Sequence, residues 1–136
     1  MMIKSLAALG VLIAAFAFTP TITFAAGEPA MVGDTEKGKA WVDANGMALY
    51  TFDKDKKGTD TSQCTGDCIA EWPPLLAAEG AKPSGDWTLV AVVDKDGAKK
   101  QMWAYDGKPL YLFVDDKKAG QVTGDGKDGF HLAKAS

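Results

Sequence analysis

An aromatic and aspartate pattern occurs twice in the chain, and this duplication constrains the fold more than any other feature. The pattern is Tyr-x-Phe-x-x-Asp, and its two copies are Tyr50, Phe52 and Asp55, and Tyr111, Phe113 and Asp116. Rings at alternate positions are typical of a strand with one buried face, so each Tyr and Phe should point into a core. The duplication therefore predicts two related β units.

The similarity between the two units continues after the motif. The corresponding positions are Thr65-Gly66-Asp67 and Thr123-Gly124-Asp125, Trp72 and Phe130, Cys64 and Val122, and Cys68 and Gly126. The cysteines are thus not duplicated, although the residues around them are. We place repeat 1 at about residues 38–79 and repeat 2 at about residues 86–134, within one domain that covers residues 38–136.

Alternating apolar residues and turn signals predict mainly β structure. The expected strands are residues 39–43, 50–52, 87–93, 99–105, 109–114 and 130–132. Asn45-Gly46 predicts a hairpin between the first two strands, and residues 87–114 predict a three-stranded meander. Residues 67–72 predict a short helical turn that Pro73 ends. We expect a small, mainly β, single domain of two β-meander or hairpin repeats with a minor short helix.

The N-terminal residues are typical of a secretory leader. Residues 6–18 are almost wholly apolar, Lys4 precedes them, and the segment that follows, residues 19–26, ends in small residues. We predict a signal peptide at residues 1–25, with cleavage after Ala25, and a flexible mature N-terminus at residues 26–37. The alternative, an uncleaved anchor, has an apolar run short of the roughly 20 residues that span a bilayer. We therefore expect no membrane span after cleavage.

The charge balance argues against a nucleic-acid partner. The full chain has a formal net charge of −3, with 15 Lys plus Arg against 18 Asp plus Glu, and every one of the 15 is lysine. Phosphate recognition usually needs a clustered basic surface and arginine. Here the lysines alternate with aspartates in polar loops, which is typical of a solvated surface.

Cys64 and Cys68 are the two cysteines of the chain. In an exported protein the first interpretation is a structural disulfide, because the compartment is oxidising. The alternative is a redox or copper site, in which both thiolates and His131 bind Cu(I), since soft ligands suit that ion. The surrounding residues show no thioredoxin-like pattern, and His131 lies at the end of the other repeat. Our first interpretation includes no cofactor, and copper belongs to the alternative.

Two further interpretations concern the motif and the surface aromatics. Asp55 and Asp116 could form a carboxylate pair for acid and base catalysis, but we expect each to accept hydrogen bonds from its own loop. No nucleophile elbow or phosphate-binding loop is evident. Tyr105 precedes an Asp-Gly turn, so an exposed ring there is a candidate contact for a partner or glycan.

These motifs resemble the bacterial secreted-repeat family, predicted lipoproteins with a Tyr-x-(Phe/Trp/Tyr)-x-x-Asp motif. The matching segments are Leu49 to Asp53, Cys64-x-Gly66-x-Cys68, Trp72-Pro73-Pro74-Leu75, Trp103-Ala104-Tyr105, Gly107 to Tyr111 and Phe130 to Ala133. The resemblance implies export, and the family has no established biochemical activity. Lipoprotein members carry a cysteine at the cleavage site. No cysteine precedes Cys64 here, so we expect no lipid anchor.

The sequence therefore predicts a non-catalytic, exported β domain, periplasmic or secreted, that acts as an envelope binding or interaction module. This prediction depends on the lack of any convergent catalytic set. The alternative is a periplasmic redox or copper-binding protein that uses Cys64 and Cys68. The sequence does not identify the partner in the envelope or outside the cell.

Overall fold

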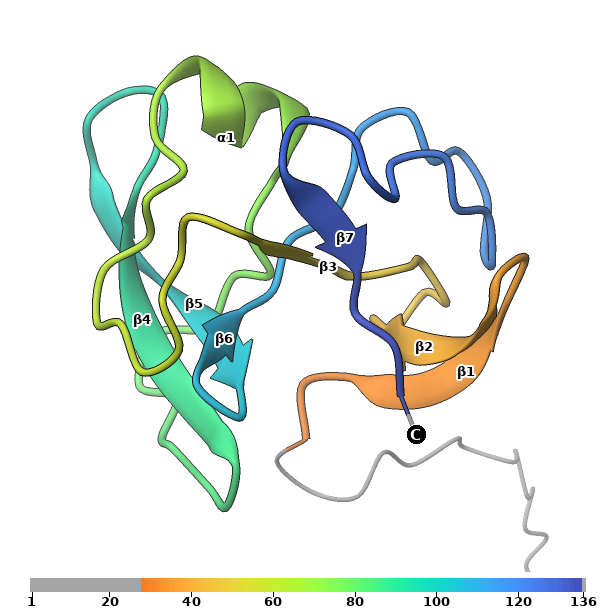
Figure 1. The fold of residues 1–136 in the computed structure, drawn as a ribbon. Helices are drawn as coiled ribbons and strands as arrows, with labels where there is room; N and C mark the ends of the chain where they lie inside the picture. Colours follow the sequence, from red (N-terminus) through yellow and green to blue (C-terminus); the bar gives the residue numbers. More distant parts are fainter. Residues whose placement is uncertain (1–27, 136) are drawn as a thin grey trace, which may run out of the picture.

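The computed structural model describes residues 28–135, so the predicted signal peptide at residues 1–25 lies outside the described residues. The described chain forms three small antiparallel sheets and one short helix. Figure 1 shows the sheet of β4, β5 and β6 on one side, the β1 and β2 hairpin on the other, and β3 and β7 between them. The predicted mainly β fold is thus confirmed.

The first sheet corrects the prediction of a flexible segment at residues 26–37. β1 (Met31–Thr35) pairs antiparallel with β2 (Gly38–Val42) over its whole length. β1 is mostly solvent-exposed, and Met31 retains 39% of its accessible surface. Backbone pairing holds β1 in place without a regular apolar face, and therefore the residue pattern gave no strand signal.

The second sheet joins the two repeats. β3 (Tyr50–Phe52) pairs antiparallel with β7 (Phe130–Leu132), so the strand that carries the first motif lies beside the end of the chain. The predicted turn at Gly46 forms, with a hydrogen bond from its N–H to the Asp43 carbonyl at 2.9 Å. The predicted hairpin of β2 and β3 is nevertheless wrong as the main pairing, because β2 meets this segment only at Ala48 and Leu49.

The third sheet has the strand order β4-β5-β6. It contains β4 (Trp87–Val93), β5 (Lys99–Tyr105) and β6 (Lys108–Pro109). The predicted meander is therefore confirmed, but its third strand ends at Pro109 instead of residue 114. The chain leaves the sheet there, because Tyr111 makes backbone bridges to Tyr50 and Pro74.

The helix α1 (Asp67–Glu71) forms where a helical turn was predicted, and Trp72 and Pro73 follow it. It buries Ile69 against the main core. Within residues 28–135, no helix has the length and apolar character needed to cross a membrane.

Two apolar clusters fill the interior. The first contains the motif aromatics of both repeats, together with Trp72, Phe130 and buried residues of β4 and β5. The second lies around Trp87 and Trp103, and the half-buried rings of Trp41 and Tyr105 pack against it. The first cluster thus belongs to both repeats, and the second places two partly exposed rings at the surface.

Candidate functional site

The two motif strands lie against each other at their tyrosines. The Tyr50 N–H donates to the Tyr111 carbonyl at 2.8 Å, and the Tyr111 N–H donates to the Tyr50 carbonyl at 2.9 Å. Both tyrosines are fully buried. This reciprocal antiparallel bridge relates the two repeats by an approximate two-fold axis.

The tyrosine hydroxyl groups cross between the repeats. The Tyr50 hydroxyl donates to Asp116 Oδ2 at 2.6 Å, and the Tyr111 hydroxyl donates to Asp55 Oδ2 at 2.5 Å. Each motif therefore supplies the tyrosine of one pair and the aspartate of the other. Hydrogen bonds to a buried carboxylate are among the stronger ones in proteins, so these two bonds tie the repeats together.

Each motif aspartate also orders the loop that follows it, as we predicted. Asp55 Oδ1 accepts the Gln63 N–H at 2.7 Å. Asp116 Oδ1 accepts the N–H and the hydroxyl of Thr123 at 2.8 and 2.7 Å. One oxygen of each carboxylate thus fixes its own loop, while the other holds the opposite repeat.

Four rings form a stack that obeys the same approximate symmetry. Its order is Phe52, Phe130, Trp72 and Phe113, with neighbouring centroids 4.2, 3.9 and 4.2 Å apart and interplanar angles of 8°, 4° and 22°. Exchanging the repeats converts the stack into itself, because Phe52 corresponds to Phe113 and Trp72 to Phe130. Tyr50 meets Trp72 edge to face at 5.3 Å, and Tyr111 meets Phe130 in the same way at 5.3 Å.

Burial controls the ionisation of this core. Loss of solvation raises the pKa of Tyr50 and of Tyr111, and the aspartate that faces each hydroxyl raises it further. Burial also raises the pKa of Asp55 from its usual 3.8, against the opposing effect of hydrogen bonds from Tyr111 and Gln63. Both tyrosines therefore keep their protons at neutral pH and act as donors. These groups are buried, and the hydrogen bonds between them join the two repeats.

Cys64 and Cys68 form a disulfide with a Cα to Cα distance of 5.3 Å. Cys64 is fully buried in the main core, at the position that Val122 occupies in repeat 2. His131 lies on the exposed face of β7, and its Nε2 is 2.9 Å from Asp53 Oδ2. Across residues 28–135, no group of three or more His, Cys, Asp or Glu side chains is arranged to hold a metal ion.

A groove opens over the outward face of β3. It consists of two adjoining cavities, of about 230 and 280 Å³, which share Thr51 and Lys108. Trp41, Tyr105 and Lys134 line the first cavity. Lysines 56 and 57 line the second, together with Asp53 and Asp55. The strand backbone places Thr51 in the groove, because Tyr50 and Phe52 point inward and the residue between them must point outward.

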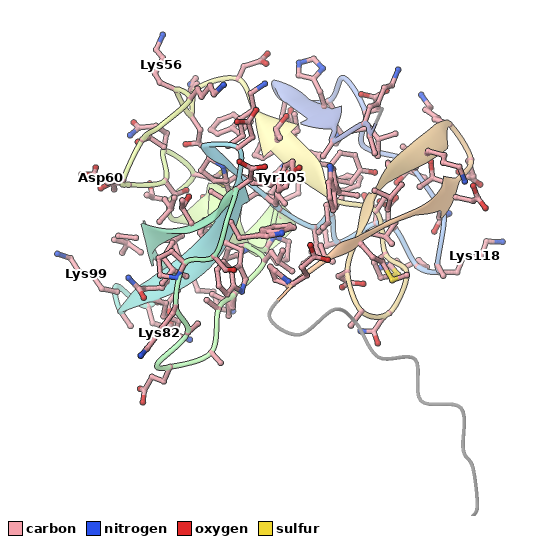
Figure 2. All side chains as sticks on the ribbon, turned by 90° about the horizontal axis from the view of Figure 1, so that it is seen from below. Lys56, Asp60, Lys82, Lys99, Tyr105 and Lys118 are labelled. Carbon is pink, nitrogen blue, oxygen red and sulfur yellow. A yellow bond between two sulfur atoms is a disulfide. The ribbon has the colours of Figure 1, made fainter. Side chains whose placement is uncertain are left out.

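The aromatic wall of the groove is well defined. The rings of Trp41 and Tyr105 lie with centroids 4.4 Å apart and planes inclined at 42°, and both are half-buried. The 3.5 Å ion pair between Lys57 and Asp106 compensates one carboxylate of the groove. Figure 2 shows Tyr105 near the middle of the molecule seen from below, with Lys56 at the margin.

A comparison with known protein families identifies the duplication. A family model described as "Secreted repeat of unknown function" matches residues 31–76 and 90–131. The chain belongs to this family. No curated protein and no solved structure matches this chain. The two matched segments agree with the two repeats, and the first begins at the start of β1.

Membership of the secreted-repeat family gives the compartment in general terms, because the family is described as secreted. The protein is therefore exported. The family description names no activity, so the function must be argued from the geometry.

The sequence predicted the buried motif residues but not most of the groove. Tyr105 was a predicted candidate for a surface contact, whereas Trp41, Thr51, Lys108 and Lys134 were not. The strand period already predicted an outward Thr51. The other groove residues come from separate segments, which only the fold brings together.

Proposed function

We propose that this exported protein is a non-catalytic binding module of the cell envelope or its surroundings, and that the groove over β3 is its binding surface. One observation carries this proposal. The motif side chains capable of acid and base chemistry are buried and hydrogen-bonded to each other, whereas aromatic rings and lysines face the groove.

The use of the polar groups supports a scaffold function for the motif. Asp55 and Asp116 retain only 8% and 5% of their accessible surface, and each carboxylate accepts bonds at both oxygens. A catalytic group must come within hydrogen-bonding distance of its substrate. Both oxygens of each carboxylate already accept hydrogen bonds within the protein, although Asp55 also borders the second cavity. In contrast, the groove combines apolar rings with polar groups, as ligand sites do.

The proposal is tested by blocking the groove. In Thr51→Tyr, a bulky side chain that suits a strand fills the space between the two cavities. Thr88→Tyr is the matched control, because Thr88 is an exposed threonine on β4. Both variants and the natural protein are labelled, mixed with the envelope fraction of the producing cells and sedimented.

We expect the natural protein and Thr88→Tyr to sediment with the envelope and Thr51→Tyr to stay in solution. Equal sedimentation of all three would contradict the assignment of the groove. An enzymatic activity that one polar substitution abolishes, with the fold intact by circular dichroism, would contradict the non-catalytic function.

A further inference from the structure

The dimensions of the groove restrict what it can hold. Its two cavities measure about 230 and 280 Å³, and each is below the roughly 300 Å³ at which pockets for drug-sized ligands begin. They adjoin at Thr51 and Lys108, so they form a row and not one deep pocket. This shape suits successive small units of a linear polymer better than a single large ligand.

The walls of the first cavity match the surface of a sugar ring. Trp41 and Tyr105 present partly exposed aromatic surface, and such rings combine an apolar body with a polar edge. A pyranose likewise has an apolar face of C–H groups and a rim of hydroxyls. Among residues 28–135, no side-chain hydrogen bond occupies the hydroxyls of Thr51 and Tyr105. These hydroxyls are therefore available to the rim of the sugar.

The charge of the first cavity favours an acidic ligand. Lys108 and Lys134 both line the first cavity, and the ion pairs found among residues 28–135 involve neither of them. The carboxylate of the same cavity, on Asp106, is already paired with Lys57. Two uncompensated ammonium groups beside an aromatic wall suit a carboxylate on the ligand.

The backbone argues against an extended peptide as the ligand. A peptide that adds a strand needs an unpaired sheet edge. β3 pairs with β7 on one side, and Tyr50 bridges Tyr111 on the other. β2 is likewise flanked by β1 and by the C-terminal segment through Ala133. Recognition at the groove must therefore depend on side chains.

We infer that the groove binds an acidic saccharide chain, with a sugar ring against Trp41 and Tyr105 and a carboxylate between Lys108 and Lys134. This inference rests on the proposed binding function and names its ligand class. A second sugar unit extends past Thr51 into the second cavity, which lysines 56 and 57 line together with Asp53 and Asp55.

The test uses two uronate probes, tetragalacturonate and an alginate tetrasaccharide, with isothermal titration calorimetry at low salt. Uncharged maltotetraose and the acidic peptide tetraglutamate are the comparison probes. The variant Lys108→Gln with Lys134→Gln removes the two ammonium groups. Its matched control is Lys82→Gln with Lys99→Gln, two exposed lysines that are labelled in Figure 2 and line neither cavity of the groove.

We expect at least one uronate to bind, maltotetraose and tetraglutamate to bind at least about tenfold more weakly, and the groove variant to lose at least about tenfold in affinity. The control variant should retain its affinity. The ligand class is overturned if neither uronate binds, if tetraglutamate binds as tightly, or if both lysine pairs have equal effects.

The two failures are distinguishable. If neither uronate binds but Thr51→Tyr still abolishes sedimentation with the envelope, the groove is the binding surface and the acidic saccharide is wrong. If Thr51→Tyr sediments normally, the proposed function itself fails.

Discussion

Replacing Tyr50 by Phe and Asp116 by Asn, singly and together, tests whether the tyrosine hydroxyl of one repeat bonds to the aspartate of the other. Tyr50→Phe removes the 2.6 Å bond to Asp116 Oδ2 and the acceptor for the Gly124 N–H at 3.2 Å. The ring remains in the core, so the apolar contacts are kept. Asp116→Asn keeps the shape of the acceptor and removes its charge.

The expected size follows from the burial of this bond. Hydrogen bonds to charged groups contribute about 1.5–3 kcal/mol, and both partners here are buried. We therefore expect Tyr50→Phe to lower the free energy of unfolding by about 2 kcal/mol. Contacting pairs couple by about 0.5–3 kcal/mol, and we expect at least about 1 kcal/mol between Tyr50 and Asp116.

The assay is urea unfolding of the oxidised protein, followed by tryptophan fluorescence. With an m-value of about 2 kcal/mol/M, the loss in Tyr50→Phe moves the midpoint by about 1 M. The second cycle pairs Tyr50→Phe with Asp55→Asn, its own repeat's aspartate, whose carboxylate shares no hydrogen-bond partner with the Tyr50 hydroxyl. That pair should be additive within about 0.5 kcal/mol. Stronger coupling of Tyr50 to Asp55 than to Asp116 would refute the crossed arrangement.

Four other substitutions test the core. Trp72→Phe should change the free energy of unfolding by less than about 1.5 kcal/mol in urea unfolding, because the buried Trp72 Nε1 has no hydrogen-bond partner among residues 28–135 and the other repeat has Phe there. Cys64→Ala with Cys68→Ala should lower it by about 2 kcal/mol, the loop-closure value for five residues. Gly124→Ala should lower the thermal midpoint, at a cost of about 1–3 kcal/mol, since its Cβ would lie 2.6 Å from the Trp72 ring. For Asp55→Asn, the stability of the natural protein relative to the variant should fall as pH rises from about 3 to about 7.

The sign for Asp55 follows from its raised pKa in the folded protein. The folded state binds the proton more tightly than the unfolded state, so the favourable contribution is complete below the usual 3.8 and is lost as pH rises through the folded value. Asp94→Asn is the control of opposite sign. The hydrogen bond from the Ala98 N–H lowers the pKa of Asp94, so its contribution is lost as pH falls. A pH dependence of the same sign for both would contradict this reasoning.

Each of the other three predictions has its own control variant or contradicting outcome. Trp72→Ala should cost about 3–5 kcal/mol, and a similar cost for Trp72→Phe would mean that the indole edge is required. Gly66→Ala meets no atom within 4 Å, although its φ of +60° adds strain. If it matched Gly124→Ala, the ring contact would not be the cause. A cysteine-free variant that fails to fold would show that the core depends on the disulfide.

The sequence predicted the parts of the fold that are encoded over a few residues. Alternation at Tyr50 and Phe52 predicted their inward direction, and the prolines after Trp72 predicted the end of α1. Each of these depends on neighbours within about six residues. The disulfide followed from the predicted export, since Cys64 and Cys68 are the two cysteines of the chain. The duplication itself was visible because both copies keep the same side chains.

The relation between the repeats was beyond a local reading. The two crossed hydrogen bonds span 66 and 56 residues. The motif itself is equally compatible with a bond between each tyrosine and the aspartate of its own repeat. β3 was assigned to β2 because a turn joins them, but β7 and Tyr111 supply most of its backbone partners. β1 was missed because it lacks an apolar face. The groove was missed because its walls come from distant segments, which meet only after the repeats have paired.

The most direct test of the crossed core is a nuclear Overhauser measurement on the labelled protein. The Tyr50 hydroxyl accepts the Gly124 N–H at 3.2 Å, so the ring protons beside this hydroxyl should show a strong effect to the Gly124 amide proton. The corresponding protons of Tyr111 should show one to the Ser62 side chain, whose Oγ is 2.6 Å from the Tyr111 hydroxyl. Effects from Tyr50 to Ser62 and from Tyr111 to Gly124 instead would place each tyrosine in its own repeat and contradict the account.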